Sequence, residues 1–252
     1  MDLRDEVTVE FSGGSDSTLA AAIGAERFQK VHLLSVTHDG IKNVERADGQ
    51  IENLKRRYGE DKIAVYRTDI RRLLRRIYYD KYFGDIVRFG THVSAFSCVA
   101  CKMAMDVETA VYNLSNGVRY IFDGQQRENQ MWPMQMESVI EIMQDFFGEY
   151  GLIYECPVYG IKRTDKILHE KGVTDVPDVK FRAILRQTPE SAYETASERS
   201  YQGSCYGATI PNIFLTGYYI PVWGQQRHEE KSAAYYTEKL DLLRELIDER
   251  LS

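Results

Sequence analysis

The sequence has few cysteines, lacks a long apolar run and carries no excess of positive charge. Four cysteines in 252 residues are too few for a disulfide scaffold, and one CxxC pair among them is more typical of metal or redox chemistry in a reducing compartment. No run of about 18 apolar residues occurs, so we expect no membrane-spanning helix. A formal net charge of −6 argues against a nonspecific nucleic-acid coat, although a local basic patch would still suit one RNA.

Other signals of location and metal binding are also missing. The first residues run directly into a strand pattern without a secretory signal, so we expect a cytoplasmic protein. The five histidines are scattered and show no ligand spacing, so they identify no metal site. No low-complexity linker divides the chain, and hydrophobic and charged fractions of 43% and 28% are ordinary for a globular protein with a sizeable core.

Strand and helix patterns alternate along the first two thirds of the chain. Apolar, β-rich runs predict strands at Glu6–Phe11, Val31–Thr37, Lys62–Arg67, Val118–Phe122 and Leu152–Tyr154. Helical patterns lie between them, at Thr18–Phe28, Val44–Tyr58, Ile70–Tyr79, Thr91–Leu114 and Met134–Tyr150. The alternation predicts an α/β fold, a five-stranded and mainly parallel sheet with helices on both faces. Ligands of such sheets bind at the carboxyl ends of the strands.

The pattern changes near residue 172. Prolines interrupt the chain from there on, until Glu229–Leu251 forms a long amphipathic helix. Its apolar stripe consists of Leu240, Leu243, Ile247 and Leu251. We therefore expect residues 1–171 to form the α/β domain and residues 172–252 to form a helical and irregular extension packed on it.

The loop between the first strand and the first helix suits phosphate. It contains Ser12, Gly13, Gly14, Ser15, Asp16, Ser17 and Thr18. Glycines let the backbone approach an anion closely, and the unpaired N–H groups and dipole of a helix start favour negative charge. The hydroxyls of Ser12, Ser17 and Thr18 offer further donors. No Gly-Lys-Ser/Thr follows, so this is not the Walker pattern.

This loop resembles the SGGxDS signature of the N-type ATP pyrophosphatases, the PP-loop enzymes of the adenine nucleotide alpha hydrolase superfamily. In layout the resemblance extends over residues 1–171. It implies that the loop holds the pyrophosphate portion of ATP and that Val36, in the second strand, also contacts the nucleotide. It implies an enzyme that transfers AMP to a substrate and releases pyrophosphate. A carboxylate beside triphosphate needs a cation between them, so Asp16 is expected to hold Mg²⁺.

A second segment follows the fourth predicted strand. It reads Asp123, Gly124, Gln125, Gln126, Arg127, Glu128 and Asn129. It is similar to the DGTNxDD segment of PP-loop enzymes that insert sulfur into the nickel-pincer cofactor, with two glutamines in place of Thr and Asn and with Glu128 and Asn129 in place of the two acids. The resemblance implies that Asp123 and Gly124 contact ATP and that Glu128 contacts Mg²⁺.

The stretch from Cys156 to Ile167 resembles a third segment of the same family, a proline followed by a lysine at a helix start. In this sequence the lysine is Lys162. As a point charge beside the carboxyl edge of the sheet, it would neutralise phosphate.

Two cysteines lie in the Thr91–Leu114 segment. Its helical stripe of apolar residues is Phe96, Ala100, Met103, Val107, Ala110 and Leu114. At 100° per residue, Cys98 and Cys101 fall beside each other on the opposite side of the helix. We therefore expect them to face a cleft, a partner or solvent, and their spacing suits two thiolates on one metal ion or cluster.

The CxxCK form resembles the sulfur-transfer members and the tRNA thiocytidine synthetases, some of which hold an iron–sulfur cluster with three cysteines. This implies a [4Fe–4S] cluster on Cys98, Cys101 and either Cys205 or Cys156, used to thiolate a tRNA base or a small molecule. Ser204-Cys205-Tyr206 is instead similar to the SCY of the cyano-deazaguanine synthases, which use ammonia and a zinc knuckle. In that alternative the four cysteines would bind Zn²⁺. A non-catalytic ATP- or AMP-binding regulator is a third alternative.

The partners expected from these resemblances are ATP, an acceptor that is a tRNA or a small molecule, and a sulfur or ammonia donor, with a homodimer left open. Arg71, Arg72, Arg75 and Arg76 form a basic helical stretch that suits RNA phosphates. A solvated helix face is the commoner reason for such a run.

Overall fold

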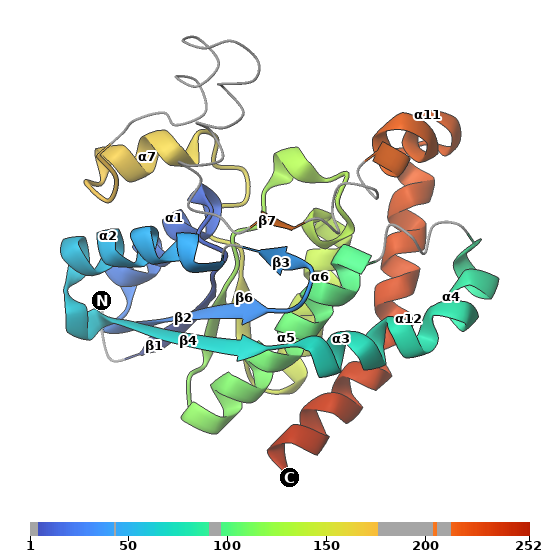
Figure 1. The fold of residues 1–252 in the computed structure, drawn as a ribbon, viewed down its shortest axis with the longest axis horizontal. Coiled ribbons are helices and arrows are strands. Elements are labelled where there is room, and N and C mark those ends of the chain that lie inside the picture. The colour runs from blue at the N-terminus through green and yellow to red at the C-terminus, as the bar shows by residue number, and fades with distance from the viewer. Residues whose placement is uncertain (1–4, 43, 91–96, 176–203, 206–212) are drawn as a thin grey trace.

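The α/β fold is confirmed in a computed structural model, which describes residues 5–42, 44–90, 97–175, 204–205 and 213–252 (Figure 1). Five parallel strands form one sheet in the order β4-β2-β1-β5-β6. Their bounds are β1 (Glu6–Glu10), β2 (Lys30–Thr37), β4 (Ile63–Asp69), β5 (Tyr120–Phe122) and β6 (Ile153–Glu155). Each matches a predicted strand, with ends shifted by one or two residues.

Helices cover both faces of the sheet, as the alternating pattern predicts (Figure 1). One apolar core lies under α1 (Ser15–Arg27), α2 (Asp48–Tyr58) and α7 (Thr164–Glu170). The other core lies under α3 (Arg71–Ile77), α4 (Tyr82–Phe89), α5 (Ser97–Asn116), α6 (Glu137–Glu149) and α12 (Gln225–Leu251). Shorter turns are the 3-10 helices Val44–Ala47, Glu60–Lys62, Tyr79–Lys81, Arg127–Asn129 and Pro133–Gln135, the π-helix Leu215–Tyr219, and α11 (Ile220–Trp223).

The central strand β1 explains why the sheet needs two layers of helices. Val7 and Val9 are fully buried, and so are the polar side chains of Thr8 and Glu10. Strands of a parallel sheet that is covered on both sides are apolar almost throughout. A carboxylate at position 10 is therefore an exception to the pattern of this strand.

The order of the strands creates a switch point beside β1. The chain moves from β1 through β2 to β4 at one edge, and then returns to place β5 on the other side of β1. In folds of this kind, ligands usually bind at such a switch point, beyond the carboxyl ends of the strands. The Ser12–Thr18 loop and the Asp123-Gly124 turn both lie at this switch point.

A small second sheet was not predicted. β3 (Ile41–Lys42) pairs antiparallel with β7 (Ser204–Cys205), so that Ile41 lies opposite Cys205. This pairing brings the backbone of residue 205 close to the end of β2, although more than half of the chain separates the two in sequence.

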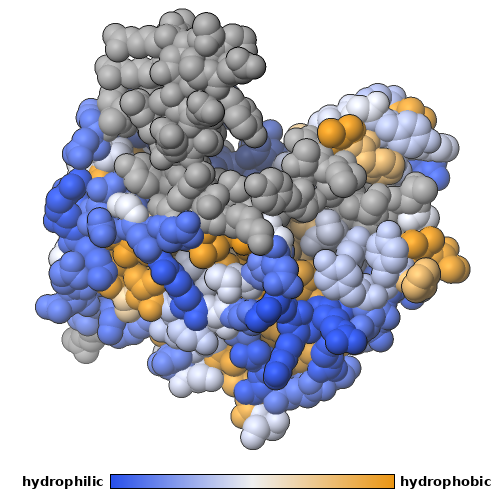
Figure 2. Space-filling model, viewed as in Figure 1, coloured by the Kyte–Doolittle hydropathy of each residue, from blue (hydrophilic) through white to orange (hydrophobic). Residues whose placement is uncertain are grey.

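The C-terminal helix is part of the main core. Tyr235, Tyr236, Leu243 and Ile247 of α12 are buried in one cluster with α5 and α6. Leu251, which the predicted stripe included, is 44% exposed at the end of the helix. Within the described residues, no helix combines the length and the apolar character that crossing a bilayer requires. Figure 2 shows apolar surface at the end of the molecule that carries α4 and α11, where Phe83, Val87 and Val222 are exposed.

Candidate functional site

The loop after β1 forms an open helix start. Gly14 occupies the N-cap position of α1, so no side chain caps the first N–H groups of the helix. Gly13 has a φ of 80°, a left-handed conformation that favours glycine. The Ser17 hydroxyl donates to the Gly14 carbonyl (3.2 Å) and lies 3.2 Å from the exposed Ser12 hydroxyl. Unpaired N–H groups at a helix start bind anions.

The three predicted hydroxyl donors differ in burial, because Ser17 and Thr18 are buried whereas Ser12 is exposed. Thr18 is fully buried, and its hydroxyl donates to the Gly14 carbonyl at 2.8 Å. Ser17 is also buried, although its hydroxyl is near Ser12. Among the predicted hydroxyl donors, Ser12 is thus the one at the surface, while Thr18 stabilises the turn.

Asp16 joins three segments. Its Oδ1 accepts hydrogen bonds from the Thr164 hydroxyl (2.7 Å) and from the Gln126 side-chain amide (3.3 Å). The segment that follows β5 and the one that follows β6 therefore meet the loop after β1. Thr164 was not among the predicted site residues. Its position just after Lys162, at the start of α7, was the available signal.

Gly124 lies directly against the start of α1. A Cβ atom at this position would be 2.7 Å from the Ser17 nitrogen and 2.9 Å from its Cα. Only glycine permits such an approach of two backbones. The Asp123-Gly124 turn therefore lies directly beside the loop after β1.

The remaining predicted nucleotide contacts lie at different depths. Lys162 is 78% exposed and forms an ion pair with Glu128, at 3.3 Å between Nζ and Oε1. Arg163, the next residue, adopts a left-handed conformation with φ 56°, which costs a non-glycine residue about 1 kcal/mol. Val36 is half-buried in β2 and packs against the apolar core.

A buried charge cluster lies beneath the loop. Lys102 Nζ is 2.6 Å from Glu10 Oε2 and 3.1 Å from Asp123 Oδ2, and it also contacts Asp106 one helical turn away. Tyr154 donates to Asp123 Oδ2 at 2.6 Å. Asp123 is only 5% exposed, so its side chain faces the protein and supports the turn that Gly124 completes.

Burial and the charges of neighbouring groups shift the pKa values within this cluster. Burial raises the pKa of Glu10 well above its usual range, against the attraction of Lys102. Burial likewise raises the pKa of Asp106. Burial opposes the charge on Lys102, but the carboxylates of Asp106, Asp123 and Glu10 raise its pKa well above the ordinary value. Burial would also raise the pKa of Asp123, yet Lys102 and the hydrogen bond from Tyr154 hold it low. The single ammonium of Lys102 is thus shared by three buried carboxylates, two with a raised pKa and one, Asp123, with a lowered pKa.

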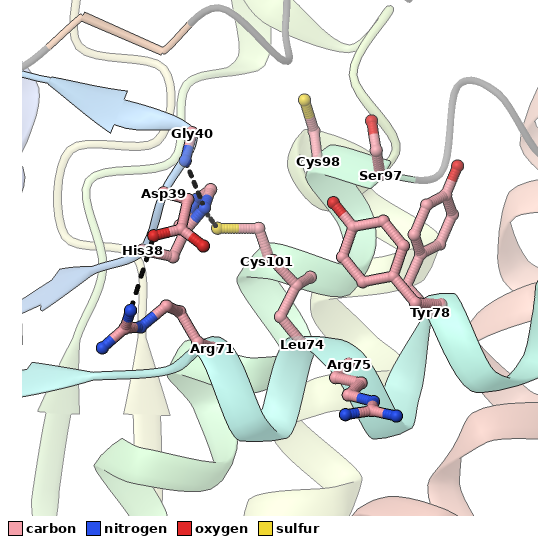
Figure 3. A pocket seen from close by; sticks show the side chains of 11 residues that line it. His38, Asp39, Gly40, Arg71, Leu74, Arg75, Tyr78, Ser97, Cys98 and Cys101 are labelled. Atoms are coloured by element: carbon pink, nitrogen blue, oxygen red, sulfur yellow. Dashed lines mark hydrogen bonds and ion pairs between the residues drawn. The ribbon is translucent and has the colours of Figure 1, made fainter.

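A separate cavity of about 450 Å³ lies at the carboxyl ends of β2 and β4 (Figure 3). Its lining includes Cys98 and Cys101, which confirms that both thiols lie off the buried face of α5. Ala100 and Met103 form that buried face, while Phe96 lies outside the described residues. Figure 3 shows the two thiols pointing in different directions, with Cys101 directed at His38 and Cys98 turned away from it.

Like Thr164, His38 is a site residue that was not predicted from the sequence. Cys101 Sγ and His38 Nε2 are 3.3 Å apart, within hydrogen-bond distance for sulfur. The Gly40 N–H donates to His38 Nδ1 at 3.0 Å. Burial lowers the pKa of His38, while Asp39 and Asp69 oppose the shift. The available signal was position, because His38 directly follows a predicted strand.

The predicted metal centre needs thiols that converge. In the described part of the chain, no three His, Cys, Asp or Glu side chains are arranged to hold one metal ion. Cys156 packs against the main core at the end of β6, where burial and Asp123 raise the pKa of its thiol. The side chain of Cys205 lies outside the described residues, although its backbone pairs with Ile41. The described thiols therefore do not converge on one ion, and a shared cluster or zinc ion stays a prediction.

The basic helix α3 is matched by acids. Arg76 pairs with Glu245 at 2.6 Å and contacts Glu249, both on α12. The hydrogen bond that Arg76 donates to Glu249 raises the pKa of Arg76, and partial burial opposes this shift. These pairs join α3 to the C-terminal helix and occupy Arg76 within the protein.

No protein-family model matches this chain, and no curated protein matches it either. Its function therefore has to be argued from the two sites described above.

Proposed function

We propose that this protein is an ATP-using enzyme that transfers AMP to an acceptor and releases pyrophosphate, after which a sulfur atom displaces AMP. The observation that carries this proposal is the uncapped start of α1 after β1, closed on one side by Gly124. Gly13, Gly14, Ser12 and the first N–H groups of the helix would hold the pyrophosphate portion of ATP.

In the first step an acceptor oxygen attacks the α-phosphorus, and the bond to the oxygen that bridges to the β-phosphorus breaks. Negative charge then builds on the leaving pyrophosphate, and the start of α1 stabilises it. Asp16 is half-buried, is oriented by Thr164 and Gln126, and has the ligand chemistry for Mg²⁺. A bound Mg²⁺ would supply further stabilisation of the phosphate charge. Lys162, paired with Glu128 at the rim, would add a mobile positive charge.

The test is the position of cleavage in ATP. Purified protein is incubated with ATP and Mg²⁺, without added acceptor, and slow transfer to water is followed by chromatography. AMP and pyrophosphate are the expected products. ADP and phosphate, or binding of ATP with no cleavage above that of a Ser17→Ala variant, would contradict the proposal. The second of these results would favour a nucleotide-binding regulator.

A further inference from the structure

The cavity beside the cysteines is distinct from the phosphate loop. Its walls come from the turn after β2, from α3 and from the start of α5, and no residue of the Ser12–Thr18 loop lines it. It nevertheless opens at the same edge of the sheet, because β1 and β2 are adjacent and parallel. A molecule in this cavity would lie one strand away from the α-phosphate of a nucleotide held at the loop, since neighbouring strands are about 5 Å apart.

Hydrogen bonding determines which ring nitrogen of His38 carries the proton. The Gly40 N–H is a donor, so His38 Nδ1 must accept and cannot carry a proton. A neutral imidazole then has its proton on Nε2, which is the atom next to Cys101 Sγ. His38 therefore donates to the sulfur and does not remove its proton. A donor held on sulfur stabilises the thiolate.

Gly40 is necessary for this arrangement. A Cβ atom at position 40 would lie 2.7 Å from His38 Cε1. The glycine thus allows the ring to fold back over its own turn, where Nδ1 meets the backbone and Nε2 faces α5. This close fit links the turn after β2 to the reactive face of Cys101.

The lining of the cavity has the composition of a carboxylate site. Arg71 and Arg75 provide two guanidinium groups, and each has an acidic partner: Arg71 lies 3.6 Å from Asp39 and Arg75 lies 3.3 Å from Asp80. Both pairs are exposed, and exposed ion pairs are weak, so a carboxylate of the acceptor can exchange for these acids. Asp69 accepts from the Arg71 Nε at 2.7 Å and so fixes this side chain at the rim. Leu74 and Tyr78 form an apolar wall. Guanidinium groups recognise carboxylates through paired N–H donors.

We infer that this cavity binds the acceptor, that the acceptor is a small carboxylic acid, and that Cys101 is the sulfur atom that displaces AMP. This inference rests on the proposed function and names its acceptor class. The acceptor carboxylate attacks the α-phosphorus and becomes an acyl adenylate. The Cys101 thiol releases its proton to solvent, the thiolate attacks the acyl carbon, the new carbon–sulfur bond forms, and the carbon–oxygen bond to AMP breaks. AMP leaves with the electron pair, and the acyl group remains on Cys101 as a thioester.

The experiment uses two alkylating reagents as probes and needs neither ATP nor the natural acceptor. Iodoacetate carries a carboxylate, whereas iodoacetamide is neutral and of nearly the same size. Rates at each cysteine are measured by peptide mass spectrometry on the full chain. We expect Cys101 to react about tenfold faster than Cys98, and we expect its ratio of iodoacetate to iodoacetamide rates to exceed that of Cys98.

Variants separate the hydrogen bond from the charge. His38→Leu is expected to slow both reagents at Cys101 by about tenfold, and His38→Gln to restore part of the rate, because its amide still donates. Arg71→Gln and Arg75→Gln are expected to slow iodoacetate several-fold and to leave iodoacetamide unchanged. Gly84→Ala is the control, since nothing lies within 4 Å of a Cβ atom at that position in α4.

Three results would overturn the inference: equal rates at Cys98 and Cys101, a reagent ratio that the arginine variants leave unchanged, or protection of both thiols by bound zinc or iron. Melting curves of each variant identify any loss of folding, and His38→Gln serves where His38→Leu does not fold. Cleavage of ATP to AMP and pyrophosphate is measured separately. If the alkylation rates contradict the role of Cys101, the cleavage of ATP to AMP and pyrophosphate is still supported by its own assay. If ATP is not cleaved in this way, the alkylation rates still identify a carboxylate-binding cavity with a reactive thiol.

Discussion

Gly124 lies so close to Ser17 that a Cβ atom at position 124 would be 2.7 Å from the Ser17 nitrogen and 3.0 Å from the Asp16 carbonyl carbon. Both neighbours are backbone atoms at the start of α1, so neither can move without tilting the helix. Gly124→Ala must therefore displace either the phosphate loop or the turn after β5. We expect it to weaken ATP binding by at least about tenfold, because oriented N–H groups are lost. Isothermal titration calorimetry measures this change.

Gly148→Ala is the matched control for that variant. Gly148 lies in α6, and nothing is within 4 Å of a Cβ atom there. Alanine in a helix is favoured over glycine by up to about 1 kcal/mol, so the control should be at least as stable as the parent and bind ATP equally. Unchanged binding in Gly124→Ala would show that the close contact has no role in the nucleotide site.

Asp16 and Ser17 provide the second prediction. Asp16→Ala and Ser17→Ala are each expected to slow pyrophosphate release by about 10²–10³-fold, the usual effect of losing an oriented donor or metal bridge. Asp16 is half-buried at the start of α1 and bonds to the side chains of Thr164 and Gln126, so loss of its carboxylate leaves the apolar core intact and the fold should survive. The measurement is a coupled pyrophosphate assay, with circular dichroism to verify folding. A variant that keeps its full rate would remove that residue from the mechanism.

The sequence predicted those parts of the molecule that depend on local patterns. Apolar runs located all five strands, and the glycine-rich turn after β1 located the start of α1, because both signals are contained in a few adjacent residues. Helix α4 was missed because it is short and its apolar pattern does not match its burial: Phe83 and Val87 are exposed, whereas Asp85 is buried against Lys239. The short sheet of β3 and β7 was missed because it pairs segments far apart in sequence.

Site residues were harder to predict where their role depends on burial or on contacts between residues far apart in sequence. Lys102 and Asp106 have the spacing of a solvated ion pair on a helix, yet α5 is enclosed on nearly all sides and both are buried. The contact of His38 with Cys101 spans 63 positions, and no spacing rule connects them. The shared helix face of Cys98 and Cys101 was predicted from their spacing, but the direction of each thiol depends on side-chain rotation, and Figure 3 shows the two pointing in different directions.

The pair of Lys162 and Glu128 gives the third prediction. Lys162→Gln is expected to raise the KM for ATP a few-fold, because an exposed point charge contributes about 1 kcal/mol or less. If Lys162 serves phosphate, Glu128→Gln releases it from its 3.3 Å ion pair and should lower the KM at saturating Mg²⁺. If Glu128 is instead a ligand of Mg²⁺, the same variant raises the Mg²⁺ concentration needed for activity. Steady-state kinetics at two Mg²⁺ concentrations distinguish these outcomes.

The buried cluster of Lys102 makes the stability of the protein depend on pH. Burial raises the pKa of Glu10 and of Asp106 in the folded state. Between the unfolded value, about 4.3 for Glu, and the higher folded value, the folded state binds more protons than the unfolded state. Stability therefore falls as pH rises through this window. Glu10→Gln removes one of the two groups, so we expect a flatter decline between pH 5 and pH 8, measured by urea unfolding.

Lys102→Met should make the decline of stability between pH 5 and pH 8 steeper. Removal of the ammonium leaves Glu10, Asp106 and Asp123 without their common partner, and breaking a buried ion pair in this way costs about 3–5 kcal/mol. The three carboxylates can recover much of this at pH 5 by binding protons, but not at pH 8, so the loss should be larger at pH 8. Lys166→Met is the control, because Lys166 forms an exposed pair with Glu170 in α7, and it should change stability by less than about 0.5 kcal/mol at either pH. An equal loss at both pH values in Lys102→Met would mean that the carboxylates do not take up protons, and that the lysine acts by packing alone.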